Sequence, residues 1–168
     1  MRRLLSIAII ALAAVLSGGC GIYSFSGTSI QSDVKTITLN YFEYKALKVN
    51  PTLSNDLSEA MKDKFRKMTR LEQVDEDGDM ELEGAITGYD VRAAAITADE
   101  VAAKNRLTVT VHIKFTNNKD PEDNVEKDFS AYAEYDSTNT LDAVESTLCE
   151  QIIEQLAEDI FNACVAQW

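Results

Sequence analysis

The sequence predicts an α+β domain, a two-layer sandwich in which two helices cover one face of a four-stranded, mixed and mostly antiparallel sheet. Three observations lead to this prediction. Four segments alternate apolar and polar residues, as half-buried strands do, and two longer segments repeat apolar residues at the spacing of one helix face. The third observation is their order, β-α-β-β-β-α, which allows both helices to share one side of the sheet.

The first strand is predicted over residues 34–41, where apolar and polar residues alternate. Asn50 and Pro51 mark the start of the first helix, because asparagine caps helices and proline suits the first helical position. The apolar face of this helix repeats at Leu53, Leu57, Met61, Phe65 and Met68. Because a helix joins the first strand to the others, we expect it to pair in parallel with one of them by a right-handed crossover.

Three more strands and a long helix complete the predicted domain. Alternating patterns predict strands over residues 80–86, 107–115 and 129–135, and the short links between them favour an antiparallel meander. From about Thr140 to Ala166, apolar residues recur with helical spacing. This segment is therefore predicted to be one long helix packed on the sheet.

The face of the sheet that the helices leave free is predicted to be polar. It carries Thr108, Thr110, His112, Lys114, Ser130, Tyr132 and Glu134. Such a face is too polar to form a second core. We therefore expect it to meet water or a polar interface.

The N-terminus has the layout of a bacterial lipoprotein signal peptide. Arg2 and Arg3 precede an apolar run over residues 4–16, which is too short to span a bilayer comfortably. Small residues then end at Cys20, as in the bacterial lipobox, although Leu16 lies four residues before the cysteine rather than three. An ordinary signal peptide with an incidental cysteine is the alternative interpretation.

This layout divides the chain into three parts. We expect residues 1–19 to be a signal peptide, residues 20–32 to be a lipidated tether and residues 33–168 to be a single domain. Lipid on Cys20 would anchor the domain to a membrane from the periplasmic side. Gly21 follows the cysteine and the tether has no acidic residue, which resembles lipoproteins that are sent on to the outer membrane.

The charge of the chain excludes one class of partner. The formal net charge is −12, and it becomes −14 when Arg2 and Arg3 leave with the signal peptide. Nucleic acid is therefore not expected as a ligand, since its affinity for proteins rests mostly on contacts between phosphates and basic side chains. The same charge opposes nonspecific attraction to anionic lipid surfaces.

The sequence offers little for catalysis or metal binding. His112 is the single histidine, with no base or nucleophile at motif spacing, so it is interpreted as a solvated or interface residue. Asp75, Asp77 and Asp79 resemble the start of a calcium loop, but the glycine and glutamate that such a loop requires are missing. A charged turn is the better interpretation. We expect neither a cofactor nor an enzyme, and a small hydrolase is the disfavoured alternative.

Several short patterns follow one another along the chain: Cys20-Gly21-x-Tyr23-x-Phe25, Asn50-Pro51-x-Leu53…Leu57, Leu82-x-Gly84-x-Ile86-x-x-Tyr89, Arg106-Leu107-Thr108-Val109…Phe115-x-Asn117, Phe161-Asn162 and Trp168. Taken in order, they resemble the LptE family of outer-membrane lipopolysaccharide-assembly lipoproteins, in the branch that ends in Phe-Asn and a terminal tryptophan. Together they span essentially the whole mature chain. Their order and the terminal pattern carry the resemblance.

The resemblance implies a specific function. Members of this family plug the lumen of a large outer-membrane β-barrel, LptD, and the pair delivers lipopolysaccharide to the cell surface. A polar sheet face suits such a lumen, because the interiors of large barrels are polar. Thr110, His112 and Tyr132 are therefore the candidate barrel contacts.

Basic side chains are the candidates for contact with lipopolysaccharide. Arg92, Lys104 and Arg106 cluster around the predicted link between the second and third strands and would face anionic phosphates. Ordinary surface charges remain the alternative, and the net negative charge ranks ligand binding below the scaffold function. An accessory or binding lipoprotein of another envelope transport system is the alternative function.

Overall fold

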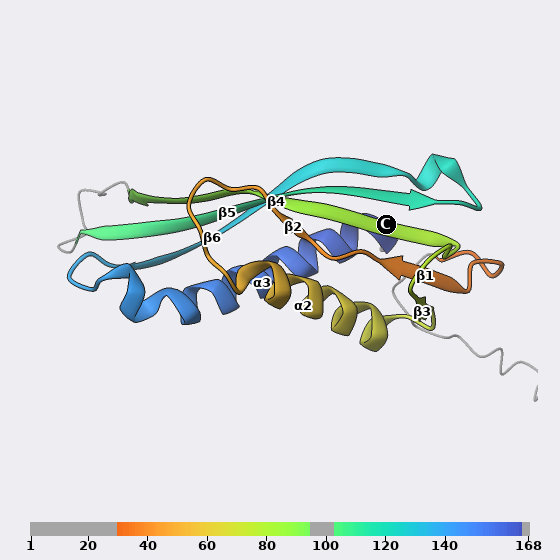
Figure 1. Cartoon of the computed structure of the whole chain (residues 1–168), viewed down its shortest axis with the longest axis horizontal. Coiled ribbons are helices and arrows are strands. Elements are labelled where there is room, and N and C mark those ends of the chain that lie inside the picture. Colours follow the sequence, from red (N-terminus) through yellow and green to blue (C-terminus); the bar gives the residue numbers. More distant parts are fainter. Residues whose placement is uncertain (1–29, 95–102, 166–168) are drawn as a thin grey trace, which may run out of the picture.

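The computed structural model describes residues 30–94 and 103–165, which form one sheet and two long helices (Figure 1). In chain order the elements are β1 (Thr36–Leu39), β2 (Glu43–Tyr44), α2 (Leu53–Met68), β3 (Glu72–Val74), β4 (Met80–Ala93), β5 (Lys104–Asn117), the short 3-10 helix η1 (Pro121–Asp123), β6 (Val125–Asp136) and α3 (Leu141–Val165). Both α2 and α3 lie on one side of the sheet (Figure 1). The predicted two-layer α+β sandwich is confirmed.

The sheet has six strands, two more than the sequence predicted. The strand order is β3-β1-β4-β5-β6, and β2 pairs with β4. β1 is parallel to β3 and β4, whereas β4, β5 and β6 form an antiparallel meander, as predicted. The two additional strands, β2 and β3, are two and three residues long, too short for alternation to be recognised in a sequence.

The second predicted strand, residues 80–86, is only the first half of β4. Ile86 pairs with Val111 and Gly88 pairs with Thr110, so the register shifts at this point and β4 contains a bulge. On the core side of β4, Met80, Leu82 and Ile86 lie an even number of residues apart, but Tyr89 follows Ile86 by three residues. This three-residue spacing is the sequence signal for the bulge, and a strand predicted from strict alternation ends before it.

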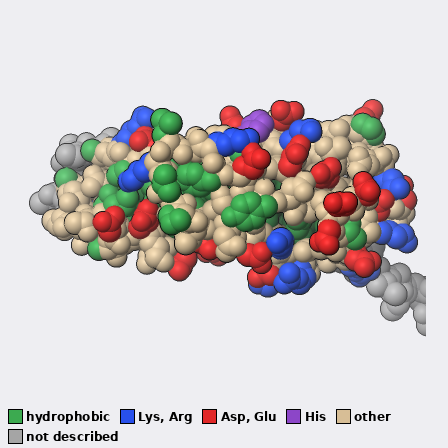
Figure 2. Space-filling view, in the orientation of Figure 1, with side chains coloured by type: hydrophobic (Ala, Val, Ile, Leu, Met, Phe, Trp, Pro, Cys, Tyr) green, Lys and Arg blue, Asp and Glu red, His purple; other side chains and the backbone are tan. Residues whose placement is uncertain are grey.

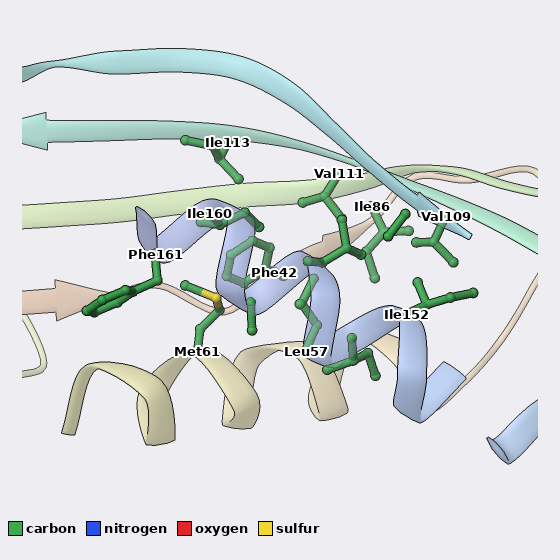
Figure 3. Packing of buried hydrophobic residues seen from close by; sticks show 14 of the residues in the cluster. Phe42, Leu57, Met61, Ile86, Val109, Val111, Ile113, Ile152, Ile160 and Phe161 are labelled. Atoms are coloured by element: carbon green, nitrogen blue, oxygen red, sulfur yellow. The ribbon is translucent and has the colours of Figure 1, made fainter. Parts of the chain in front are cut away.

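The core fills the space between the sheet and the helices, while charged side chains of both signs lie over the surface (Figures 2 and 3). On α2, four of the five predicted apolar positions are buried. Met68 is the exception, with half of its surface exposed, because α2 ends at this residue. The rings of Phe65 and Phe161 meet edge to face, with centroids 5.1 Å apart, and join the two helices.

The start of α2 depends on Asn50, as the sequence indicated, but the first helical residue is Leu53 and not Pro51. The side-chain carbonyl of Asn50 accepts hydrogen bonds from the backbone N–H groups of Thr52, at 3.2 Å, and Leu53, at 3.1 Å. Those N–H groups have no partner within the helix, so the asparagine stabilises the first turn.

The acidic segment between β3 and β4 ties the start of β4 to β1. The Asp79 carboxylate accepts hydrogen bonds from the backbone N–H groups of Lys35, at 2.9 Å, and Thr36, at 3.2 Å, and Lys119 lies 3.0 Å away. The backbone of Gly78 approaches β1 so closely that a Cβ there would lie 2.6 Å from the nitrogen of Thr38. The segment is thus a structural connection between two strands.

The described chain begins inside the predicted tether. Ile30 packs against the core, and the amide nitrogen of Gln31 donates hydrogen bonds to Asp120 and Asp123 at 3.0 and 3.2 Å. Within residues 30–94 and 103–165, no helix is long and apolar enough to cross a membrane. The predicted signal peptide and Cys20 lie outside the described residues.

Candidate interaction surface on the uncovered face of the sheet

Side chains alternate strictly along β5, which fixes the character of both faces of the sheet. The inward residues Leu107, Val109, Val111 and Ile113 are completely buried. Their neighbours point to the side that the helices leave uncovered, which we name the outer face. From β5 and β6 the outer face carries Arg106, Thr108, Thr110, His112, Lys114, Asp128, Ser130, Tyr132 and Glu134, all partly or fully exposed.

The three predicted barrel contacts lie together at the centre of this face. In the β5–β6 register, Thr110 is opposite Ser130, and their hydroxyl groups are 2.8 Å apart. His112 is opposite Asp128, with its Nδ1 2.8 Å from the carboxylate. Tyr132 has 58 % of its surface exposed. The arrangement offers hydroxyl and imidazole groups and one aromatic ring to a partner.

The three predicted basic residues also lie on one face, at the end of the sheet where β4 and β5 approach their connection. Arg92 of β4 is directly opposite Arg106 of β5, and Lys104 lies two positions from Arg106 along the same strand. Two like charges opposite each other are unfavourable unless acidic groups offset them. The basic cluster therefore exists in space, as its sequence positions suggested.

Acidic side chains already neutralise this cluster. Arg92 forms an ion pair with Asp90, and the Arg106 guanidinium bonds to Glu134 at 2.6 Å and lies 4.0 Å over the ring of Tyr132. The hydrogen bond from Arg106 to Glu134 raises the pKa of the guanidinium, which stays charged. An anionic ligand at this site would have to compete with those carboxylates.

The outer face has a depression that extends from the bulge in β4 to Arg92 and Arg106 of the basic cluster. The depression has a volume of about 450 Å³ and is lined mainly by Gly88, Asp90, Arg92, Arg106, Thr108 and Thr110. A second depression, of about 590 Å³, lies towards β1 and is lined by residues that include Tyr41, Glu83, His112 and Lys114. Both are polar and shallow, and they suit contacts with polar groups.

Sequence reasoning placed Glu134 on this face, but it missed the pairing of Glu134 with Arg106 and of Glu83 with Lys114. A carboxylate oxygen of Glu83 on β4 lies 2.8 Å from Nζ of Lys114, and this ion pair offsets part of the free-energy cost of a lysine in the middle of the sheet. The Lys114 pKa is raised by its hydrogen bond to Glu83. These pairs join residues about 30 positions apart, so no sequence spacing could have revealed them.

The comparisons with known proteins address the fold and the family. A family model described as LptE, lipopolysaccharide-assembly, matches residues 34–164. Among solved structures, the hypothetical protein CT253 from Chlamydia trachomatis is 7% identical, with 80% of this chain and 99% of that chain covered and a TM-score of 0.53. That likeness supports the fold alone.

Two structures that are lipoproteins by name are also similar. The minor lipoprotein from Acinetobacter baumannii is 18% identical over 71% of this chain and 89% of its own, with a TM-score of 0.45. Rare lipoprotein B from Shewanella oneidensis is 13% identical over 74% of this chain and 92% of its own, with a TM-score of 0.46. No curated protein matches the sequence.

Proposed function

The chain belongs to the LptE family of lipopolysaccharide-assembly proteins, and on this premise we propose that it plugs and helps to assemble a large outer-membrane β-barrel of the LptD type. The family consists of assembly proteins, and the chain is not an enzyme. The barrel with its plug would deliver lipopolysaccharide to the cell surface. Lipid on Cys20 would hold the domain at the periplasmic side of the outer membrane.

The observation that carries this proposal is the outer face. It is a regular surface of hydroxyl groups and paired charges on strands of twelve to fourteen residues, and no described element covers it. The lumen of a large barrel is itself polar and is often filled by a separate element. A rigid polar sheet face therefore suits a lumen wall better than it suits an apolar ligand.

A contact with lipopolysaccharide would be subordinate to the scaffold function. Arg92, Lys104 and Arg106 are the candidate residues, and the depression at the bulge beside them has room for polar groups. Phosphates would bind there by displacing Glu134 and Asp90 from the two arginines. Because of this competition, we expect lipopolysaccharide to bind weakly at these residues. The contact would form and break as the lipid is transferred, and it would not hold the lipid for long.

Co-purification tests the barrel partnership directly. The lipidated protein, isolated from detergent-solubilised outer membrane, should bring a large β-barrel protein with it. A photo-crosslinking residue at Thr110 or Tyr132 should capture that barrel in living cells. The same probe at Gln155, exposed on α3, is the control and should capture less of it.

Depletion tests the assembly function. Loss of the protein should lower the amount of assembled barrel and of surface lipopolysaccharide, and it should make cells permeable to bulky hydrophobic antibiotics. Unchanged levels of both would contradict an assembly function. Crosslinks from Thr110 and Tyr132 to inner-membrane transport proteins alone would support the accessory lipoprotein instead.

A further inference from the structure

The loop between β2 and α2, residues 45–50, exposes two large apolar side chains. Leu47 is fully exposed and Val49 is 76 % exposed, more than any other large hydrophobic residue that the structure describes. Hydrophobic side chains gather over this region in the space-filling view (Figure 2). Single exposed leucines are common on proteins, so their arrangement has to decide whether they matter.

The 45–50 loop is held in one shape by contacts at both ends. At its start, the backbone N–H of Lys45 donates to the carbonyl of Ile86 at 2.8 Å. At its end Asn50 is buried, and its side-chain carbonyl accepts a hydrogen bond from the backbone N–H of Leu53, the first residue of α2. Between them, the Tyr44 hydroxyl donates to the carbonyl of Lys48 and accepts from the N–H of Asn50. Leu47 and Val49 are therefore displayed by a fixed loop, which lowers the entropy lost on binding.

An acidic groove adjoins the end of this loop. Residues 50–52 form part of its wall, and its volume is about 640 Å³. In the part of the chain that the structure describes, the groove is lined by Asp56, Glu59, Asp142, Glu145 and Glu150, and by no lysine, arginine or histidine. Among the described residues Glu59 pairs with Lys62, and Glu145 accepts hydrogen bonds from Tyr89 and Asn50.

Three carboxylates of the groove have no basic partner in the described part of the chain: Asp56, Asp142 and Glu150. The outer face differs, because the basic groups there lie beside carboxylates. α3 itself contributes six acidic residues and no basic residue over its 25 positions. The groove thus carries unbalanced negative charge and adjoins the loop that exposes Leu47 and Val49.

We propose that the 45–50 loop and the adjoining acidic groove form a docking site for a second protein, separate from the outer face. The partner surface would offer an apolar pocket for Leu47 and Val49 and lysine or arginine side chains for the three carboxylates. Apolar anchors with charges around them are the usual composition of a protein interface. The inference takes from the proposed function only that this partner is the barrel.

The groove charge favours a protein over a membrane surface. Anionic lipid headgroups would be repelled by the carboxylates beside the loop. Neither lysine of the loop is free to offset them, since Lys45 pairs with Glu43 and Lys48 lies 5.5 Å over the ring of Tyr89. A protein surface can place its positive charges at the groove alone.

The test is recovery of the barrel with variants of the full lipidated chain. Leu47→Asp combined with Val49→Asp should reduce the barrel recovered by roughly tenfold or more, as the loss of a central interface anchor does. Glu150→Lys should reduce it several-fold and flatten its dependence on salt. Glu154→Lys, one turn further along α3, and Met68→Asp, at the other end of α2, are the matched controls and should behave as wild type.

The outcomes separate this inference from the proposed function. Should wild type recover no barrel at all, the proposed function fails. Normal recovery by both docking variants, with wild-type melting temperatures, would overturn the docking site and leave the plug intact. A photo-crosslinker at Leu47 that captures lipid in place of protein, or Leu47-dependent binding of the unlipidated domain to anionic phospholipid vesicles, would also overturn it.

Discussion

Asp79 shows how one carboxylate can join two strands. It accepts hydrogen bonds from the backbone of Lys35 and Thr36 and lies beside Lys119, at the point where β1 and β4 begin to run in parallel. The hydrogen bond from the Lys35 backbone, with help from Lys119, lowers the pKa of Asp79 to about 2. The charged form is thus the one that the folded state prefers.

The stabilisation that Asp79 provides should be lost in acid. Its pKa is lower in the folded state than the ordinary value of 3.8, so the unfolded chain takes up its proton first. The stabilisation is complete above about pH 5 and is lost as the pH falls towards 2. Urea unfolding at pH 7, 4 and 2.5 should show that Asp79→Asn is less stable than wild type at pH 7 and that the difference shrinks at pH 2.5.

The control for this prediction lies in the same segment. The Asp75 side chain makes no hydrogen bond or ion pair with the described residues, so Asp75→Asn should keep the pH dependence of wild type. Asp136 and Glu158 also have lowered pKa values, through hydrogen bonds from Thr138 and Lys64, so part of the acid sensitivity will remain in either variant. Equal pH profiles for Asp79→Asn and Asp75→Asn would contradict the assigned connection.

At the scale of elements, α3 is a helix that owes its stability to packing. It carries six carboxylates and no basic residue, so repulsion along its surface opposes the helix. One ion pair, between Lys64 of α2 and Glu158, offsets part of this repulsion. The buried face has to supply the rest, and it extends from Leu148 to Val165.

Leu156 is completely buried at the middle of that face. Leu156→Ala should lower the free energy of unfolding by about 2–5 kcal/mol, because it removes apolar contacts and leaves a cavity. Gln155→Ala, an exposed neighbour, is the control and should change it by less than about 0.5 kcal/mol. Thermal or urea unfolding would measure both, and a wild-type melting temperature for Leu156→Ala would contradict the packing of α3 on the sheet.

The two shortest strands, β2 and β3, could not be predicted from the sequence. The period of β5 is evident over fourteen residues, but β2 and β3 have no length in which a period can appear. They are strands because β4 and β1 offer them backbone partners, which is a property of the sheet and not of their own residues. The bulge in β4 also depends on pairing with a neighbouring strand, but the three-residue spacing from Ile86 to Tyr89 indicates it in the sequence.

The whole molecule has one side covered by helices and one side open. The outer face bears paired charges, and the helix side bears the acidic groove beside the 45–50 loop. These are the two chemically different surfaces through which we propose that the domain contacts the barrel.

Anchoring is the prediction that belongs to the whole molecule. Cys20→Ser should abolish lipid attachment and leave an uncleaved precursor or a wrongly located protein, because the thioether that carries the diacylglyceryl group cannot form. Labelling with a palmitate analogue and membrane fractionation would measure this. Cys149→Ser and Cys164→Ala, at buried thiols of α3, are controls that should still be labelled. Normal labelling of Cys20→Ser in the outer-membrane fraction would disprove the anchor.

The sequence by itself determined which side chains share a face, and therefore the two layers and the polar character of the outer face. Alternation along a strand and recurrence along a helix are local geometry, so Thr110, His112 and Tyr132 could be placed together before any contact was known. Only the tertiary structure decided which charges are neutralised. Arg106 meets Glu134 28 positions away, and Asp79 meets Lys119 40 positions away, because strand register brings them together. Register depends on the packing of the entire sheet, so the ion pairs, the bulge and the exposed Leu47 follow from the assembled fold and from no segment of the sequence alone.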